Sequence, residues 1–379
     1  MFWFLEMDEQ SMPTMTRQGK RTKVSLKDIA REAQCSIAVA STVLNATKGC
    51  SVVSDSLRER VQTVAKRLNY RPHFASQSLI RGRTNTLGVY NPPGHRNGVG
   101  DGYAGRLLDG IELECLEHGY DLLLTNRVNE GSGETCLKKL AEQRVDGLII
   151  FRSSLCSDWL PTLKSFANRV VLMDAEAVHE PFHSVVFDNA GAIGKAVEYL
   201  AELGHRRIGF LGTCLDKPQA PWLLRQEGYV KAIRALGLPQ DDCLIHDRNT
   251  SSVQMSIDDQ FCQAEGTLGM QYFLNLSPAD RPTAVIGYND LVAVNALREC
   301  LKQGLRVPQD MSVIGMGDSE RCEYLIPGLT SLRHPLEEMG QCAARFLIEV
   351  IESKQEPQKP LCVEPFSANL VCRDSVMHI

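Results

Sequence analysis

The sequence predicts a small all-α helix-turn-helix domain followed by an α/β body of two doubly wound, parallel-sheet subdomains. Three observations support this fold class. Residues 16–83 hold 14 Lys and Arg against four Asp and Glu, a net charge of +10, although the whole 379-residue chain carries −5. Short apolar stripes at helical spacing fill that basic segment. From Thr86 onward, short apolar runs alternate with helical patterns, which is typical of parallel strands covered by helices. A basic module attached to an acidic body indicates that the module meets a polyanion.

Length and composition exclude several classes of protein. The chain is long enough for two or three domains, and its 43% hydrophobic and 23% charged residues are an ordinary globular balance. No apolar run reaches the roughly 18–20 residues that cross a bilayer, so we expect no membrane segment. The apolar start, Met1–Leu5, is followed at once by Glu6, Asp8 and Glu9, which is not the pattern of a secretory signal. We expect residues 1–22 to be a disordered leader.

The 13 cysteines are scattered along the chain, with no Cys-x-x-Cys pair. Disulfide frameworks and structural zinc sites cluster their cysteines. We therefore expect free thiols in a reducing cytoplasm, and no metal site.

Three short helices are predicted in the basic segment. Ser25 and Asp28 have the spacing of a capping box, which would begin the first helix. A break at Gln34–Cys35 separates it from a second helix that Ser36 can cap, and Ser54 can cap a third. Two short helices joined by about four residues form a helix-turn-helix pattern. The apolar positions of the three helices are Leu26, Ile29, Ala30, Ala33, Val39, Ala40, Val43, Leu44, Leu57, Val61, Val64 and Leu68.

The remainder of the chain alternates strand and helix. Strands are expected at Thr86–Tyr90, Asp121–Thr125, Gly147–Phe151, Val170–Met173, Val185–Phe187, Arg207–Leu211, Thr283–Tyr288 and Ser312–Gly315. Helices are expected at Gly105–His118, Thr135–Gln143, Gly191–Leu203, Arg225–Leu236 and Asp290–Gln303. About 290 residues exceed one comfortable sheet, so we expect two subdomains. Ligands of such sheets bind beyond the carboxyl ends of the strands, where two facing sheets form a cleft.

Several motifs together resemble the LacI/GalR family of bacterial transcription repressors. They are Val24-Ser25-Leu26-Lys27-Asp28-Ile29-Ala30, Val43-Leu44-Asn45, Arg58-Glu59-Arg60-Val61, Leu68-Asn69-Tyr70-Arg71-Pro72 and Gly82-Arg83-Thr84-Asn85-Thr86-Leu87-Gly88-Val89. The resemblance runs from about Val24 to the C-terminus. It implies a non-enzymatic repressor of the bacterial cytoplasm with a periplasmic-binding-protein-like effector domain and no cofactor. One head reaches only a few base pairs, so a homodimer on duplex operator DNA is expected.

The resemblance also suggests domain boundaries. Residues 23–69 are predicted to read DNA, 70–83 to form a hinge, and 84–379 to bind the effector and to dimerise. Within the last segment, an N-subdomain is expected at about 84–188 and 334–354, and a C-subdomain at about 189–333 and 355–379.

Individual DNA contacts follow from the family pattern, in which the second helix lies in the major groove. Ile37, Ala38 and Thr42 match positions that meet base edges. Thr42 stands where Arg is common and Val39 where Thr is common. Arg would read guanine with two hydrogen bonds, whereas these residues offer methyl groups to thymine and one hydroxyl, so an unusual operator is expected. About three extra residues within 46–53 can shift nearby phosphate contacts. The predicted interface also includes Leu26, Ser36, Ser41, Asn45, Ser54 and Ser76.

Residues Tyr70–Leu79 match the hinge helix of the family. About seven residues after Pro72 are too few to stay helical alone in water, so we expect the helix to form on DNA, when two copies pair across the minor groove. Leu79 matches the position that wedges between base steps and kinks the duplex. The alternative is that Leu79 is a linker residue packed on the body.

Strand ends and resemblance together suggest an effector site. Arg225 matches a family Arg that binds effector, and Trp222 can stack on a sugar face. Such a planar charged fork, with carboxylates and aromatic rings, suits the hydroxyls of a carbohydrate or carbohydrate derivative. Gly317 replaces the first Asp of the usual Asp-Asp pair, which weakens this interpretation. The other predicted effector residues are Tyr103, Phe151, Asp174, Phe187, Asn289, Asp290 and Asp318.

Simpler structural roles are open for several of these residues. Asp188 and Asp290 can cap the helices that follow them. Arg225 can form a surface ion pair, and Tyr103 and Phe151 can belong to the core.

Two other functions match only part of the sequence. Residues Gly100–Gly105 fit Gly-x-Gly-x-x-Gly, but nine residues separate them from the first strand and no acid follows the second, which argues against a dinucleotide-binding enzyme. No nucleophile–base pattern or metal-spaced His cluster is visible either. A periplasmic solute-binding protein would share the two-lobed body, but it would carry an export signal and no basic helical module.

Overall fold

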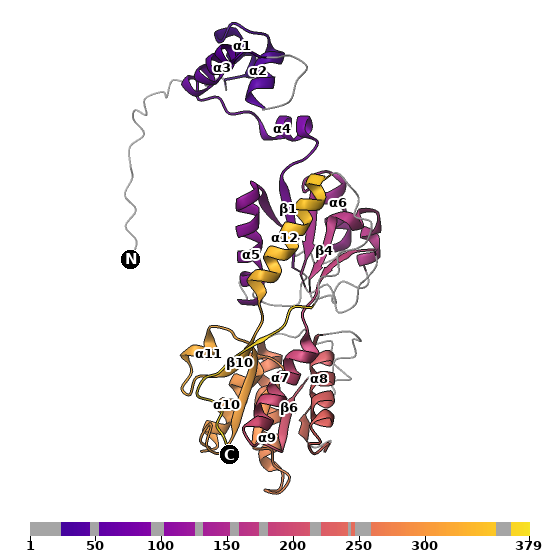
Figure 1. Cartoon of the computed structure of the whole chain (residues 1–379), viewed down its shortest axis with the longest axis vertical. Coiled ribbons are helices and arrows are strands. Elements are labelled where there is room, and N and C mark those ends of the chain that lie inside the picture. The colour runs from indigo at the N-terminus through magenta and orange to yellow at the C-terminus, as the bar shows by residue number, and fades with distance from the viewer. Residues whose placement is uncertain are drawn as a thin grey trace, which may run out of the picture. The chain divides into compact units, whose positions relative to one another are not determined.

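The computed structural model describes residues 24–45, 53–91, 102–125, 132–151, 159–173, 181–212, 221–241, 244–246, 259–353 and 365–379. The chain divides into two compact units, Met1–Gly82 and Arg83–Ile379, and many of their elements are labelled in Figure 1. The predicted leader, residues 1–22, lies outside the described residues. Among the helices that the structure describes, none is both long and apolar enough to span a bilayer.

The first unit contains the predicted helices α1 (Leu26–Glu32), α2 (Ile37–Leu44) and α3 (Asp55–Arg67). The capping box is confirmed, because Ser25 Oγ accepts from Asp28 N at 3.3 Å and Asp28 Oδ2 accepts from Ser25 N at 3.0 Å. Ser36 and Ser54 cap α2 and α3 as predicted. The three helices close around a core of small and β-branched side chains, namely Ile29, Ala30, Ala33, Ala40, Val43, Val61, Val64 and Ala65.

A fourth helix of this unit, α4 (Phe74–Arg81), stands at the predicted hinge and has no buried residue. We expected this segment to be helical only on DNA, whereas the structure has the helix already formed. Its stabilisation is local. Ser78 Oγ donates to the Phe74 carbonyl at 3.0 Å, and Gly82, at φ +69°, ends the helix with its N–H bonded to the Ser78 carbonyl.

The second unit contains two parallel sheets, as predicted. The order of the first is β2-β1-β3-β4-β5, and the order of the second is β11-β10-β9-β8-β6-β7, with β11 antiparallel to β10. The first sheet comprises β1 (Thr86–Tyr90), β2 (Asp121–Thr125), β3 (Gly147–Ile150), β4 (Val170–Met173) and β5 (His183–Val185). The second comprises β6 (Ile208–Leu211), β7 (Ile245–His246), β8 (Ala284–Gly287), β9 (Ser312–Gly317), β10 (Thr330–Arg333) and β11 (Asn369–Val371).

Helices cover both faces of the first sheet. On one face, α5 (Gly102–His118) and α12 (Leu336–Ser353) pack with Ile149 and its same-face neighbours, and Figure 1 shows these two helices alongside each other. On the other face, Leu148 and Ile150 pack with α6 (Ser132–Ala141) and the 3-10 helix η3 (Leu160–Arg169). Successive strand residues point to opposite faces, so this sheet is buried on both sides.

The backbones of α5 and α12 touch at two glycines. A Cβ on Gly340 would overlap the carbonyl oxygen of Leu107, and a Cβ on Gly110 would overlap that of Glu337. Charged pairs close both ends of the contact: Arg345 binds both carboxylate oxygens of Glu114 at 2.9 Å, and Arg106 binds those of Glu337 at 2.7 and 2.9 Å.

The second sheet is likewise covered on both faces. Phe210 stacks on Tyr229 of α8 (Pro221–Ala235), whereas the adjacent Gly209 faces Phe273 of α9 (Asp259–Asn275). Helix α7 (Asn189–Glu202) packs with α8, and α10 (Asp290–Lys302) packs with α9. A short helix, α11 (Arg321–Tyr324), lies between β9 and β10.

The chain passes between the two sheets at neighbouring crossovers. One joins β5 to α7, and its Phe187 forms a parallel bridge with Phe366, which precedes β11. Asp188 N donates to Phe366 O at 2.9 Å and Phe366 N donates to Val186 O at 2.8 Å. Another joins β10 to α12 and contains His334. The connecting segments that contain Phe187, His334 and Phe366 therefore lie close together.

The predicted elements are present, with ends shifted by a few residues. The fifth strand covers His183–Val185 rather than Val185–Phe187, because Phe187 has already left the sheet. The prediction omitted the helices η3, α9, α11 and α12 and the strands β7, β10 and β11. The cysteines that the structure describes are free thiols.

Candidate functional site

The exposed face of α2 is the candidate nucleic-acid surface of the first unit. Ala40 and Val43 bury one side of this helix in the core. Ser36, Ile37 and Ala38 are exposed on the other side, where Ile37 keeps 48% of its surface in solvent. Ser41 and Thr42 are half-buried beside them. The predicted base-reading residues Ile37, Ala38 and Thr42 thus lie on the second helix of a helix-turn-helix, away from its buried side.

Three other predicted DNA residues have structural roles here. Leu26 is half-buried and packs against the core of the first unit. Asn45 is buried, and its Nδ2 donates to Ser41 Oγ at 3.0 Å. Ser54 accepts from Leu57 N at 3.4 Å as the cap of α3 and is itself exposed. Their contacts with DNA stay predictions.

The predicted hinge residues lie on α4. Leu79 is 85% exposed, the largest value for a leucine in the described residues, and Ser76 is also exposed. Leu79 is therefore not a packed linker residue within its own unit. A leucine in this state is available to insert between bases, as the wedge prediction requires.

The second candidate site lies at the crossovers of the body, and we name it the crossover cluster: Tyr103, Arg106, Phe187, Arg225 and His334. The His334 ring lies 4.1 Å from the Phe187 ring and 6.4 Å from the Tyr103 ring, measured between centroids. Arg106 Nη2 donates to the His334 carbonyl at 3.4 Å. Arg225 lies close enough for its charge to act on His334, so three residues predicted for effector binding, Tyr103, Phe187 and Arg225, surround one histidine.

His334 is the polar centre of this cluster and was not predicted. It is 5% exposed, and its Nδ1 has no hydrogen-bond partner among the described residues. Burial, followed by the charges of Arg225 and Arg106, lowers the pKa of His334 well below the ordinary value. The ring is therefore neutral at pH 7 and offers one donor and one acceptor. A single His after a strand carries no sequence signal for this role.

Arg225 is held by neutral acceptors. Its Nε donates to Asn189 Oδ1 at 2.8 Å, and its Nη1 donates to the Tyr288 carbonyl at 2.8 Å. These contacts join α8, the start of α7 and the end of β8. The guanidinium plane is thus fixed by three elements, which is the preorganisation that a binding site needs.

Trp222, one turn before Arg225 on α8, is also part of the predicted site. It is 8% exposed, and its Nε1 is buried with no hydrogen-bond partner in the described parts of the chain. A buried indole N–H usually finds an acceptor. Phe151 is fully buried in the core, and Asp174 lies outside the described residues. The effector roles of these three residues stay predictions.

The remaining effector candidates form a hydrogen-bonded network in the second sheet. Asp290 Oδ1 accepts from Ser331 Oγ at 2.5 Å, and Ser331 Oγ in turn accepts from Asp318 N at 3.1 Å. Arg333 and Arg373 donate to the Asp318 carboxylate at 2.6 and 2.7 Å. Burial raises the pKa of Asp290. These partners give both acids a structural role, and their contact with an effector stays a prediction.

Capping explains two other residues near the strand ends. Asp188 Oδ1 accepts from Gly191 N at 2.8 Å, so it caps α7. Asn289, rather than Asp290, caps α10 by accepting from Val292 N at 2.9 Å. Asn289 also donates to Cys262 Sγ at 3.5 Å, and that thiol lies 3.1 Å from the Tyr288 hydroxyl.

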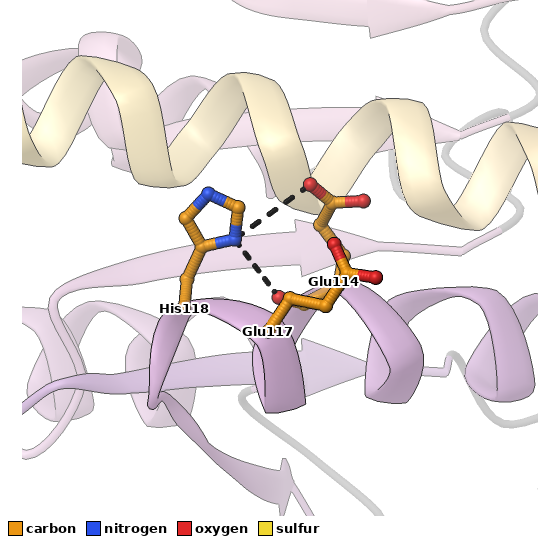
Figure 2. Close-up of side chains that lie close together, drawn as sticks. All are labelled: Glu114, Glu117 and His118. Carbon is orange, nitrogen blue, oxygen red and sulfur yellow. Dashed lines mark hydrogen bonds and ion pairs between the residues drawn. The ribbon is translucent and has the colours of Figure 1, made fainter.

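One group in α5 has the composition of a metal site. Figure 2 shows Glu114, Glu117 and His118 on one side of the helix, with their ligand atoms within 4.8 Å of one another. The Glu114 carboxylate is already bound by Arg345, which lowers the pKa of that acid. A cation would have to displace this guanidinium. The donor set therefore fits an ion-pair cluster better than a metal centre.

Comparisons with known proteins cover both units. The family described as "Bacterial regulatory proteins, lacI family" matches residues 25–73, and the one described as "Periplasmic binding protein-like domain" matches residues 197–376. The HTH-type transcriptional repressor PurR of Salmonella paratyphi A (strain ATCC 9150 / SARB42) is 31% identical over 355 residues, which are 93% of this chain and 96% of PurR.

Solved structures match over the same extent. A complex of the transcriptional regulator CelR with cellobiose has a TM-score of 0.63 at 26% identity, covering 93% of this chain and 99% of CelR. The Lac repressor dimer bound to operator and the anti-inducer ONPF has a TM-score of 0.74 with the same coverage. Its identity is 24%, so it supports the fold alone.

Proposed function

Because the chain belongs to the lacI family of bacterial regulatory proteins, we propose that it binds operator DNA as a homodimer and that a carbohydrate or carbohydrate derivative at the crossover cluster controls that binding. Membership makes the chain a DNA-binding transcriptional repressor with an effector domain, and not an enzyme. We place it in the bacterial cytoplasm, with residues 23–69 as the reader, 70–83 as the hinge and 84–379 as the sensor.

The observation that carries the effector proposal is the enclosed, neutral His334, whose Nδ1 has no hydrogen-bond partner in the part of the chain that the structure describes. A buried polar atom without a partner costs free energy, on the order of 1–3 kcal/mol. Trp222 Nε1, one turn from Arg225, is in the same condition. A ligand that supplies both a donor and an acceptor would satisfy these atoms. Carbohydrate hydroxyls do both, and aromatic rings and a fixed guanidinium suit their faces and edges.

CelR, which resembles this chain over its whole length, was solved with cellobiose. This supports a carbohydrate as the first ligand class to test.

Two exposed residues of the body support a homodimer. Tyr324 is 80% exposed and Ile326 is 91% exposed, and both belong to the segment between β9 and β10. Large side chains left in solvent at positions close together in the sequence can mark a protein contact. A second copy of this chain would cover them, and the pair would then present two heads to a pseudo-palindromic operator.

The crossovers provide a way for effector binding in the body to change DNA binding by the head. His334 and Phe187 belong to segments that join the two sheets. An effector bound there would therefore make different contacts when the two sheets are arranged differently, and it would favour the arrangement that binds it more tightly. An arrangement that the effector favours changes operator affinity by the coupling free energy, typically about 1–3 kcal/mol, or roughly 5- to 150-fold.

Replacing Arg225 tests the sensor. Arg225→Ala should abolish the effector response, measured as the change in operator affinity on adding cellobiose and a panel of mono- and disaccharides, while operator affinity without sugar persists. Arg234→Ala, in the last turn of the same helix, is the matched control and should respond normally. An unaltered response of the Arg225 variant would remove Arg225 from the site.

Replacing Leu79 tests the reader. Leu79→Ala should weaken specific operator binding much more than binding to random duplex, because the wedge acts only when two hinges insert together. The neighbouring Ile80→Ala removes a similar apolar side chain and serves as the control. Equal losses on specific and random DNA would refute the wedge.

A further inference from the structure

The exposed surface of α2 carries an unusual set of side-chain groups. The helix sequence is Ile-Ala-Val-Ala-Ser-Thr-Val-Leu, with no Arg, Lys, Asn, Gln, Asp or Glu. The amide that follows, Asn45, is buried. The groups that this helix can turn toward bases are therefore alkyl groups and hydroxyls alone. Guanine is usually recognised through a forked cation, and adenine through a forked amide. The described helix offers neither.

Internal hydrogen bonds fix which way the hydroxyls can act. Thr42 Oγ1 donates to the Ala38 carbonyl at 2.9 Å, so its proton is used and only an acceptor lone pair and the Cγ2 methyl remain. Ser36 Oγ accepts from Val39 N at 3.2 Å, which leaves its proton free to donate. Ser41 Oγ accepts from Asn45 Nδ2 at 3.0 Å and can donate in the same way.

The major-groove edge of a T·A pair is complementary to these alkyl and hydroxyl groups. Thymine carries the C5-methyl, which is the apolar group of the major groove, and adenine presents an N6 amine that donates. The Thr42 methyl and lone pair are complementary to these two groups. Guanine presents two acceptors, N7 and O6, which a Thr42 oxygen without a free proton cannot satisfy. Ile37 and Ala38 add exposed alkyl surface at the first turn of the helix.

We propose that α2 reads its half-site through thymine methyl groups, packed against Ile37, Ala38 and the Thr42 methyl, and not through a fork on guanine. This inference rests on the proposed function and specifies the base class that the operator presents. The cations of the head remain for phosphates. Arg58 and Arg60, for example, are exposed on α3 rather than on the recognition helix.

Chemical substitution in the DNA tests this directly. The full-length chain is first used to select its half-site from random duplex. Each thymine of that site is then replaced by deoxyuridine, which lacks only the C5-methyl. We expect a loss of about three- to fivefold in affinity for each contacted methyl, and no loss at thymines outside the α2 footprint.

Variants assign the contacts to side chains. In Ile37→Ala, replacement of one thymine by deoxyuridine should no longer reduce affinity, while replacement of the other thymines still does. The reason is that the side chain and the methyl group form one contact, so removing both costs no more affinity than removing either. Thr42→Arg should shift the selected base at its position to guanine. Gln62→Ala, an exposed residue of α3, is the control and should leave every penalty unchanged.

The outcomes separate the two proposals. A selected site at which deoxyuridine costs nothing, while 7-deazaguanine costs tenfold or more, would overturn the methyl readout and leave the repressor function intact. If no sequence is selected at all, the proposed function fails and this inference fails with it.

Discussion

The two candidate sites handle polar groups in opposite ways. On α2, the hydroxyls of Ser36, Ser41 and Thr42 are each hydrogen-bonded to a nearby residue, and the alkyl side chains of Ile37 and Ala38 are exposed. In the crossover cluster, the rings of His334 and its neighbours are enclosed, and a buried nitrogen has no partner among the described residues. A surface that reads a duplex can be complete before its partner arrives. In the proposed effector site, by contrast, a ligand would supply the partner of a buried nitrogen.

The cores differ as well. Eight buried residues form the core of the head, and four of them are alanines, namely Ala30, Ala33, Ala40 and Ala65. Each sheet of the body, in contrast, is covered on both faces. Small apolar surfaces give small margins of stability. The head and the body should therefore unfold as separate transitions, and changes in one core should leave the other transition in place.

Gly340→Val should give the largest effect, in the body alone. The new side chain meets the backbone carbonyl of Leu107, which cannot move aside as a flexible side chain would. We expect a loss of about 3 kcal/mol or more in the free energy of unfolding of the body, measured by calorimetry or denaturant. Gly194→Ala, at a helical glycine with open space, is the control and should be neutral or stabilising by up to about 1 kcal/mol. Equal effects of the two changes would contradict the close approach of α5 and α12.

Ile29→Ala should give the next largest effect, in the head alone. Ile29 is fully buried in the small core, so its loss should cost about 2–5 kcal/mol and abolish operator binding, while the folding transition of the body persists. Ile37→Ala removes the same side chain from an exposed position and should change the stability of the head little. If Ile29→Ala also shifted the transition of the body, the two units would not be independent.

The starts of the helices in the head, and the core that they enclose, could be predicted from sequence because they depend on residues that are close together in the chain. Ser25 and Asp28 are three residues apart, and the first four strands are short apolar runs. The same reasoning omitted α9 and α12, both of which contain glycines inside the helix. Gly266 and Gly340 weaken a helical pattern in sequence, and the reason for them is a close helix partner, Val292 in one case and Leu107 in the other. Such contacts join residues far apart in the chain.

His334→Gln should change the acid stability of the body. Unfolded His334 binds a proton below its ordinary pKa of 6.5, and folded His334 does not, so stability falls as the pH falls below that value. Each such group contributes a slope of about 1.4 kcal/mol per pH unit. The variant should lose this slope between about pH 6 and 5, measured by denaturant titrations of the body transition. Burial also lowers the pKa of His183 and His205, so part of the slope should remain. Identical slopes in variant and parent would show that His334 is solvated.

Ser25→Ala should have the smallest effect, about 1 kcal/mol in the stability of the head, because it removes the cap of α1. Ser25→Thr keeps an oxygen at the same place and should restore most of the loss. A null effect of Ser25→Ala in urea unfolding would mean that the capping box contributes nothing in solution.

The crossover cluster shows where prediction from sequence stops. Tyr103, Phe187 and Arg225 could be proposed from strand ends and family resemblance. His334 could not, because its low pKa and its neighbours arise from α5, α8 and another crossover. Asp290 and Asp318 illustrate the reverse: their sequence positions suggested ligand contact, and the structure surrounds them with Ser331, Arg333 and Arg373.

The bare surface of α4 has a practical consequence for the lifetime of the protein. Every side chain of this helix is accessible, and Arg81 in its last turn is a cleavage point for a trypsin-like protease. One cut there would separate the helix-turn-helix unit from the body permanently. If bound duplex covers this helix, as the proposed hinge role requires, the operator-bound protein should be degraded more slowly than the free protein, and operator occupancy would affect how long each copy survives.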